Sequence, residues 1–305
     1  MFTIVGGGFG LYGYLPAILS DSKDGVVLLA ERYRKVIDSR PELNRYSERI
    51  VWCSSIPDAL SKASGAVIAI PPTAQQALVY DLLSIRKLKK LIIEKPLCPQ
   101  PSDSVSLISA LLADSKCFRV GYTFLYTNWC RELESNLKQP AARVQINWSF
   151  KADHFLKNKD TWKRYHSLGG GVIRFYGIQL LAVLASLGYS AVVFSKLFAR
   201  LPDQPDAWAA QFSGENIPLC DVFVATHADE NYFQIIVNES PEVVRFFYND
   251  ASPFIKTLSA EDQDNRIPIL EKLLNSMNHN ENRYLRIYHA TNELWKLTEK
   301  FHEDP

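Results

Sequence analysis

The sequence lacks the marks of several protein classes. Its five cysteines are widely scattered and form no Cys-x-x-Cys pair, so we expect neither a metal site nor a disulfide framework. Acidic and basic residues nearly balance, 33 against 34, and no long basic run interrupts that balance, so no nucleic-acid partner is expected. No run of apolar residues reaches about 18 residues, the length that a membrane span needs.

The chain of 305 residues is long enough for two domains, and its hydrophobic fraction of 47% is ordinary for a globular protein. A strand-like run begins at residue 2 and leaves no room for a signal peptide before it. We therefore expect a soluble cytoplasmic protein without membrane contacts.

Three consecutive patterns at the N-terminus predict a dinucleotide-binding turn. Residues 2–5 are apolar and strand-like, residues 6–13 are rich in glycine, and residues 14–19 are helix-like. This context suits a phosphate-binding fingerprint, because glycines let the backbone approach a pyrophosphate and a helix N-terminus supplies amide donors. A simple tight turn is the alternative. The candidate cofactor contacts are Gly6, Gly8, Phe9, Gly10 and Leu11.

Two registers of the glycine fingerprint are possible. Gly8-x-Gly10-x-x-Gly13 fits the pattern literally. Gly6-x-Gly8-x-x-Leu11 lacks the third glycine but places the first one directly after the strand. We favour the second register, with Gly10 partly compensating for the missing glycine.

Glu31 and Arg32 follow the second predicted strand, residues 26–30, about 20 residues beyond the glycines. An acidic residue at this position bonds the adenosine ribose of NAD, whereas an arginine suits the 2′-phosphate of NADP. NAD is the first choice and NADP stays open. The alternative is a solvated strand end without a ligand.

The first half of the chain alternates strand-like and helix-like segments, which predicts a parallel sheet with helical crossovers. We expect an N-terminal Rossmann domain over residues 1–122. Its further strands are predicted at 51–53, 66–70, 89–93 and 118–122, and its further helices at 56–63, 73–83 and 102–112.

The second half has a different pattern, which predicts a C-terminal α+β domain over residues 123–305. Its strand-like runs follow one another without intervening helices, so the sheet should be open and mostly antiparallel. An irregular polar stretch covers residues 151–167. The predicted strands are 143–150, 191–200, 208–212, 220–226, 232–237 and 243–248, and the predicted helices are 172–187, 265–277 and 282–301.

Lys95 lies in a Glu-Lys-Pro corner at the carboxyl end of a buried strand. Open α/β sheets bind their ligands at this end of the strands. Taken alone, Lys95 has an alternative interpretation as a solvated turn residue.

Together, the glycine turn, Ile70-Pro71-Pro72, Glu94-Lys95-Pro96 and the triple glycine at residues 169–171 resemble the glucose-fructose oxidoreductase / inositol dehydrogenase (Gfo/Idh/MocA) family. The resemblance implies an NAD(P)-dependent oxidoreductase whose open second sheet forms a homo-dimer or homo-tetramer. It also implies that Lys95 lies beside the nicotinamide and contacts the reacting oxygen of the substrate.

The resemblance assigns further positions and reveals departures from the family pattern. Ile70, Pro71 and Glu94 would lie along the cofactor, and Gln75 stands where the family has a histidine. Four and eight residues after the third glycine, the family has an aspartate and a histidine that bind substrate and move its proton. Here these positions hold Phe175 and Gln179, and a glutamine cannot act as a general base near neutral pH.

Polar residues near these positions remain candidates for a basic, aromatic pocket that suits an anionic or sugar-like substrate. We expect Tyr176 and His166 as replacement proton donors beside Lys95, with Gln179 as a further candidate for the catalytic set. The candidate substrate contacts are Tyr122, Lys163, Arg164, Arg174, Tyr176 and Gln179.

Three functions compete. The first is an oxidoreductase that acts on a carbonyl, imine or hydroxyl group of a small polar substrate, with Lys95 polarising the oxygen or donating the proton. The second is a non-catalytic sensor or partner protein that keeps the fold and the cofactor. The third is a redox-neutral activity, such as elimination or epimerisation, with a tightly held cofactor.

Overall fold

The computed structural model describes residues 1–20, 25–139, 141–254, 264–279 and 281–300. These residues form two compact units. The first unit comprises Met1–Leu97, Ser106–Thr123 and the described part of Lys256–Asn282. The second unit comprises Cys98–Val105 and the described parts of Phe124–Ile255 and Arg283–Pro305. The predicted domain bounds, residues 1–122 and 123–305, stay a prediction.

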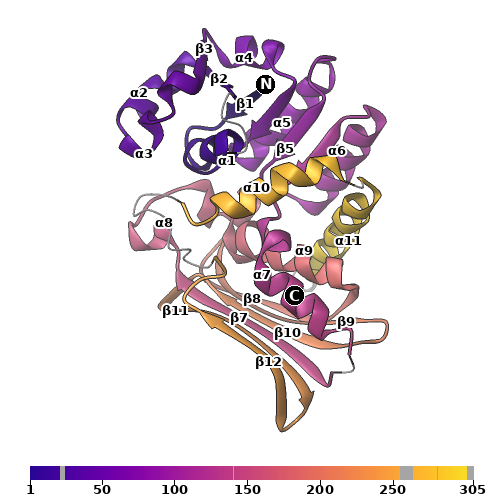
Figure 1. Ribbon diagram of the computed structural model, residues 1–305. Coiled ribbons are helices and arrows are strands. Elements are labelled where there is room, and N and C mark those ends of the chain that lie inside the picture. Colours follow the sequence, from indigo (N-terminus) through magenta and orange to yellow (C-terminus); the bar gives the residue numbers. More distant parts are fainter. Residues whose placement is uncertain (21–24, 140, 255–263, 280, 301–305) are drawn as a thin grey trace. The chain divides into compact units, whose positions relative to one another are not determined.

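A six-stranded parallel sheet forms the centre of the first unit, as expected for a Rossmann domain (Figure 1). The strand order is β3-β2-β1-β4-β5-β6. Its inner strands are apolar runs buried on both faces, which is typical of parallel sheets covered by helices. The strands are β1 Phe2–Val5, β2 Val27–Ala30, β3 Ile50–Cys53, β4 Gly65–Ile68, β5 Lys90–Ile93 and β6 Cys117–Val120.

The helices of the first unit follow local signals in the sequence. At the start of α4, for example, the Ser55 hydroxyl accepts a hydrogen bond from the Asp58 backbone N–H at 3.2 Å, and a proline occupies the first turn. The helices are α1 Leu15–Ser20, α2 Arg34–Asp38, α3 Pro41–Asn44, α4 Ile56–Lys62, α5 Pro72–Leu83 and α10 Ile267–Asn275. Helix α6, Pro101–Ala113, has residues in both units.

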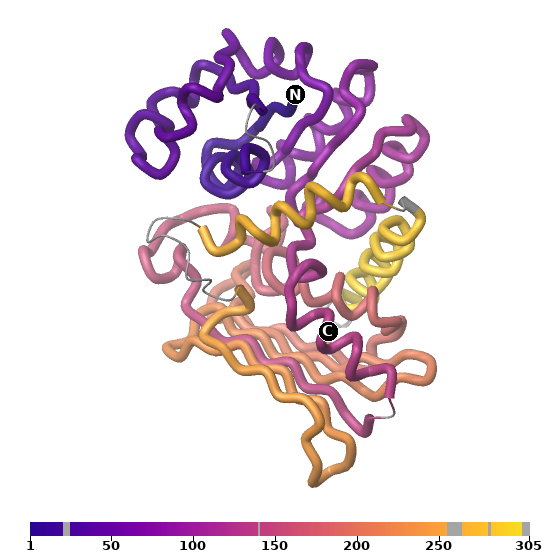
Figure 2. The backbone as a smooth tube through the Cα atoms, viewed as in Figure 1, coloured from indigo at the N-terminus to yellow at the C-terminus, as the bar shows by residue number. Residues whose placement is uncertain are grey.

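Helix α10 comes from a distant part of the sequence and lies beside α1 in the first unit (Figure 2). Arg119 of β6 holds the residues that follow α10. Its buried guanidinium donates hydrogen bonds to the Ser276 hydroxyl at 3.1 Å and to the Ser276 carbonyl at 2.7 Å. These bonds satisfy a charge that would otherwise be costly to bury.

The second unit contains a six-stranded sheet in the order β12-β11-β7-β10-β9-β8. Neighbouring strands are antiparallel except for β7 and β10, so the expected mostly antiparallel sheet is confirmed. The strands are β7 Arg143–Lys151, β8 Tyr189–Leu201, β9 Gln204–Gly214, β10 Ile217–Ala225, β11 His227–Ser240 and β12 Val243–Asp250.

One face of this sheet is packed and the other is open. Side chains that pair across neighbouring strands lie on the same face, and one such row consists of Trp208, Val224, Trp148 and Phe233, all buried. Helices α7, Asn128–Asn136, and α9, Ile178–Leu187, lie on the packed side (Figure 1).

The remaining helices are α8, Asp153–Leu156, in the second unit, and α11, Glu281–Lys300, which belongs to the second unit from Arg283 on. Short turns occupy the stretch predicted as irregular. The helix predicted after the triple glycine begins as a π-helix, Val172–Gly177, and continues as α9. Within the described parts of the chain, a single stretch, His166–Leu187, is long and apolar enough to cross a membrane, although no unbroken apolar run of that length was expected. Because 78% of its most apolar window is buried, as in a core helix, it is weak evidence for a span.

Candidate functional site

The carboxyl ends of four neighbouring strands meet at one edge of the first sheet. The backbone N–H of Ala69 donates to the Val5 carbonyl at 2.8 Å, and the N–H of Glu94 donates to the Ile68 carbonyl at 2.9 Å. The backbone N–H of Gly121 donates in the same way to the Ile93 carbonyl at 2.8 Å. The glycine turn and the Glu-Lys-Pro corner therefore lie at the edge where open α/β sheets bind ligands.

The glycine turn has the geometry that the second register requires. Gly6 has a φ of +140°, and a Cβ atom there would lie 2.2 Å from the Ala69 carbonyl oxygen. A Cβ on Gly10 would meet the Ile4 side chain at 2.9 Å. By contrast, no atom of the described chain lies within 4 Å of a Cβ built on Gly8. Gly6 is thus needed for packing against β4, whereas Gly8 leaves room for another molecule to approach the backbone.

Phe9 and Leu11 complete the predicted turn. The Leu11 N–H donates to the Gly8 carbonyl at 2.9 Å, which starts the π-helix Gly10–Tyr14. The Phe9 ring lies 4.0 Å from the Arg266 guanidinium carbon, a cation–π contact that the sequence reasoning missed. Arg266 also pairs with Asp264 at 2.6 Å. No spacing signal connects residue 266 with residue 9, so only the fold could have identified this neighbour.

The Gln75 side chain bonds three carbonyls of the Glu-Lys-Pro corner. The Nε2 atom of buried Gln75 donates to the Glu94 carbonyl at 2.7 Å, the Pro96 carbonyl at 3.0 Å and the Leu97 carbonyl at 3.2 Å. Gln75 reaches the corner because its helix starts at the end of β4, directly after Ile70 and Pro71, and its N–H donates to the Pro71 carbonyl at 2.9 Å. The glutamine thus fixes the backbone on both sides of Lys95.

Glu94 is held inside the first unit. Its carboxylate accepts the Tyr14 hydroxyl at 2.5 Å and the Lys95 backbone N–H at 3.3 Å. A Cβ on Gly121 would lie 2.6 Å from Oε1, so glycine there makes room for the carboxylate. Burial raises the pKa of Glu94, and the charge of Lys95 and the Tyr14 hydrogen bond oppose that rise. Glu94 therefore helps to position the Lys95 backbone through this hydrogen bond.

Glu31 lies in the short turn that follows β2, with Tyr33 beside it. The Glu31 carboxylate forms an exposed ion pair with Arg34, and the hydrogen bond from Arg34 lowers its pKa, so it is ionised at neutral pH. The Tyr33 hydroxyl accepts the Gly6 N–H at 3.0 Å, which ties this turn to the glycine turn. Arg32 is exposed, with its guanidinium carbon 5.8 Å from the Tyr33 ring centre.

In the second unit, the triple glycine allows a close contact with the preceding segment. A Cβ on Gly170 would lie 2.2 Å from the Trp162 carbonyl oxygen, and Gly171 has a φ of +73°. Phe175 packs against the Trp162 ring at 5.1 Å, and the Lys163 ammonium lies 5.1 Å from the Phe175 ring centre. Phe175, which stands where the resemblance places an aspartate, is thus packed between an aromatic ring and a cation.

Gln179 and Tyr176 lie on the same helical stretch, and neither supplies a base. The buried Gln179 carbonyl oxygen accepts the Phe124 backbone N–H at 3.3 Å. Burial raises the pKa of the Tyr176 phenol, which therefore stays protonated near neutral pH and cannot act as a base. Sequence reasoning missed His154, whose ring lies 6.2 Å from the Tyr176 ring and whose pKa is lowered to about 4, chiefly by burial. Its position in an irregular segment gave no signal.

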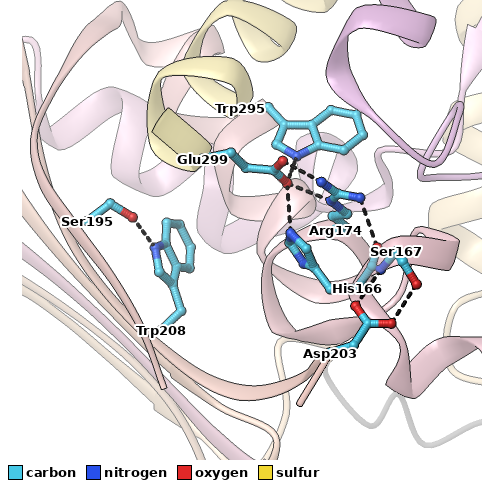
Figure 3. A network of polar contacts seen from close by, with 8 residues as sticks. All are labelled: His166, Ser167, Arg174, Ser195, Asp203, Trp208, Trp295 and Glu299. Atoms are coloured by element: carbon cyan, nitrogen blue, oxygen red, sulfur yellow. Dashed lines mark hydrogen bonds and ion pairs between the residues drawn. The ribbon is translucent and has the colours of Figure 1, made fainter. Parts of the chain in front are cut away.

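Arg174 is joined to the C-terminal helix α11 rather than left open to a ligand (Figure 3). Its Nε and Nη2 atoms donate to the Glu299 carboxylate at 2.7 and 2.6 Å, and its Nη1 atom donates to the His166 carbonyl at 2.8 Å. The Trp295 indole also donates to Glu299 at 2.7 Å, and His166 Nε2 lies 3.6 Å from the same carboxylate. Arg174 and His166, both predicted as functional, thus belong to one network of hydrogen bonds and ion pairs around Glu299.

The remaining candidates, Tyr122 and Arg164, belong to different units. Tyr122 follows β6 in the first unit and is 2% exposed. Arg164 is in the second unit, where it donates to the His154 carbonyl at 2.5 Å. Among the described residues, no group of three or more His, Cys, Asp and Glu side chains could hold a metal ion.

Solved structures of the same fold were found by structural comparison. GenD2 from gentamicin A biosynthesis, in complex with NAD, is 14% identical with a TM-score of 0.77, over 99% of this chain and 94% of GenD2. The WlbA dehydrogenase from Bordetella pertussis, in complex with NADH and UDP-GlcNAcA, is 12% identical with a TM-score of 0.75, over 98% and 96%. A super-repressor mutant of Gal80p from Saccharomyces cerevisiae is 12% identical with a TM-score of 0.73, over 99% and 94%.

No family model and no curated protein matches the sequence. The structural likenesses nevertheless extend over nearly the whole chain, and at this level of identity they establish the fold. The parallel sheet and the mixed, mostly antiparallel sheet are those that the resemblance implied. The chain therefore has the two-domain fold of the Gfo/Idh/MocA-type dehydrogenases.

Proposed function

We propose that this protein is an NAD-dependent oxidoreductase that acts on a carbonyl, imine or hydroxyl group of a small polar, sugar-like or anionic substrate. The observation that carries the proposal is the arrangement at the carboxyl edge of the first sheet. There the glycine turn, with free space beside Gly8, and the Lys95 corner, which Gln75 holds by hydrogen bonds, follow neighbouring strands. GenD2 and WlbA, which have this fold, were solved with NAD or NADH.

The residues of the glycine turn fit a dinucleotide. Gly8 offers backbone without an obstructing side chain, and the following helical segment presents N–H groups to a pyrophosphate. Glu31 is ionised, and its exposed pair with Arg34 is weak enough for the carboxylate to turn to ribose hydroxyls. An ionised Glu31 repels a 2′-phosphate, which favours NAD over NADP.

Lys95 carries the proposed chemistry. The nicotinamide, when bound, supplies or accepts a hydride. The ammonium of Lys95 would polarise the substrate oxygen and donate a proton to it, and Gln75 and Glu94 keep the lysine backbone in place. Because Gln179 is no base and Tyr176 stays protonated, reduction of a carbonyl or imine needs fewer further groups than oxidation.

The test is a comparison of wild type and Lys95→Ala. The purified wild type should bind NADH more tightly than NADPH, as measured by nicotinamide fluorescence. The variant should bind NADH with unchanged affinity but lose about 10²- to 10⁴-fold in turnover, the usual contribution of a positioned proton donor. Normal turnover by Lys95→Ala would contradict the assignment.

A second candidate function is a cofactor-binding regulator without turnover. It is favoured by Phe175 and by Gln179, whose side-chain oxygen bonds the Phe124 backbone, and by the structural likeness to the Gal80p super-repressor mutant. A regulator would bind NADH but change the absorbance of reduced nicotinamide with no substrate in a screen. It would also gain no activity in the double variant Phe175→Asp/Gln179→His.

Retained cofactor with product formation but no net NADH change would instead indicate redox-neutral chemistry.

The open face of the second sheet supports a further proposal, self-association into a dimer or tetramer. Phe194, Phe223 and Phe247 are exposed on this sheet, and Phe194 and Phe247 belong to one cross-strand row. An exposed apolar surface of this kind is typical of protein–protein contacts. Light scattering should give a mass above that of one chain, and Phe223→Glu should lower it.

A further inference from the structure

The second unit contains a cavity whose lining comes from four segments. Its volume is about 310 Å³, at the small end of ligand pockets. Helix α8 and the residues after it form one wall, and the ends of β8, β9 and β11 form the other. The residues that matter here are Phe155, Asn158, Arg164, Arg200, Asp206 and His227.

The charges in this cavity do not cancel. Arg200 Nε lies 3.1 Å from the Asp206 carboxylate, so these two charges neutralise each other. The pKa of His227 is lowered, chiefly by burial, so the ring is neutral near pH 7. Among the residues that the structure describes, Arg164 has only neutral acceptors, the His154 carbonyl at 2.5 Å and the Asn158 side-chain oxygen at 3.3 Å. The lining thus has one net positive charge, on Arg164.

Arg164 also has an unused donor. Its Nε atom is buried and has no hydrogen-bond partner among the described residues. A buried donor without a partner is unfavourable, and guanidinium groups bind carboxylates and phosphates through two parallel N–H donors. The chemistry that would compensate the charge of Arg164 in the lining is therefore a single anionic group.

An aromatic wall holds the guanidinium of Arg164 in place. The Phe155 and His227 rings are stacked, 4.4 Å apart and within 2° of parallel. The guanidinium carbon of Arg164 lies 5.1 Å from the Phe155 ring centre, so the Phe155 ring contacts both the cation and the imidazole. The packing of Phe155 thus limits how the guanidinium can reorient.

We propose that this cavity is a binding site for one carboxylate or phosphate group, held by Arg164. This inference does not rest on the proposed function, because no nicotinamide cofactor enters it. It applies to an oxidoreductase and to a regulator alike.

The test is thermal unfolding of the full chain in inorganic phosphate or acetate, with ionic strength held constant by sodium chloride. A bound anion raises Tm in a saturable manner, from which Kd follows. Comparison of phosphate with acetate identifies the preferred anion. Arg164→Met should weaken binding by about tenfold or more, since a charge-assisted hydrogen bond is lost. Arg131→Met, an exposed arginine of the same unit that bonds Asn128, should bind as wild type does.

Asp206→Asn provides a second variant in which binding should improve. Removing this carboxylate leaves Arg200 uncompensated and gives the cavity a second net positive charge, so Kd should fall several-fold. A gain in affinity cannot come from damage to the fold. The proposal is overturned if neither anion produces a saturable shift, or if Arg164→Met and Asp206→Asn bind as wild type does.

Discussion

The carboxyl edge of the first sheet and the triple-glycine helix of the second unit use their polar residues differently. At the sheet edge, the side chains of Gln75 and Glu94 bond the backbone around Lys95. On the helix, Arg174 and Gln179 are themselves engaged by structural partners. The comparison teaches that the side chains of the first region hold the backbone around Lys95, whereas Arg174 and Gln179 in the second have hydrogen-bond partners of their own; the functional roles of both sets stay predictions.

Breaking the Arg174–Glu299 pair is expected to have the largest effect on stability. Both side chains are at most 10% exposed, so removing one partner leaves a buried charge without compensation. Arg174→Met should lower the free energy of unfolding by about 3–5 kcal/mol. Chemical denaturation followed by tryptophan fluorescence measures this loss.

The control is the double variant Arg174→Met/Glu299→Leu, in which no buried charge remains. It should recover much of the lost stability, because a buried ion pair is often replaced by apolar residues without loss. If Arg174→Met were as stable as wild type but lost substrate binding, Arg174 would be a substrate residue and the contrast between the two regions would fail.

Protonation of His154 should produce the next largest effect. The folded pKa of about 4 lies below the ordinary value of 6.5, so the unfolded chain binds more protons than the folded chain between these pH values. Stability should therefore fall as pH is lowered from about 6.5 to 4, by on the order of 3 kcal/mol in total. Urea unfolding at a series of pH values gives this slope.

The matched variant is His154→Phe, which keeps an aromatic ring among Phe155 and Tyr176 but cannot titrate. Its stability should depend less on pH than that of wild type across the same interval. Identical slopes in the two proteins would show that acidic groups alone cause the pH dependence.

The three hydrogen bonds from Gln75 to the Glu-Lys-Pro corner, which we call the Gln75 clamp, are expected to contribute less to the free energy of unfolding than the Arg174–Glu299 pair. Gln75→Leu leaves three backbone carbonyls of the corner without their donor, and should cost about 1–3 kcal/mol. It should also lower turnover more than NADH affinity, because the corner holds Lys95. Gln75→His, which again offers a ring N–H, is the comparison. Equal behaviour of the leucine and histidine variants would argue against a clamp.

The sequence predicts local backbone geometry better than contacts between distant side chains, for a physical reason. Glycines, the Glu-Lys-Pro corner and apolar strand-length runs indicate backbone geometry, and each signal lies within a few consecutive residues. Arg174 depends on Glu299, which lies 125 residues away, and Phe9 depends on Arg266. No periodicity connects such partners. The apolar pattern of residues 172–187 also could not distinguish a π-helix from an α-helix, because both bury the same residue types.

The smallest effect on stability is expected at Gly8, where the prediction concerns the ligand alone. A Cβ there meets no described atom within 4 Å, so Gly8→Ala should leave the free energy of unfolding nearly unchanged. It should weaken NADH binding by about tenfold, since a methyl group keeps the pyrophosphate from the backbone. Gly7→Ala is the matched control, because its Cβ would touch the Tyr33 ring at an ordinary 3.4 Å and affinity should persist. Equal NADH affinities in the two variants would mean that the open backbone at Gly8 is not the phosphate site.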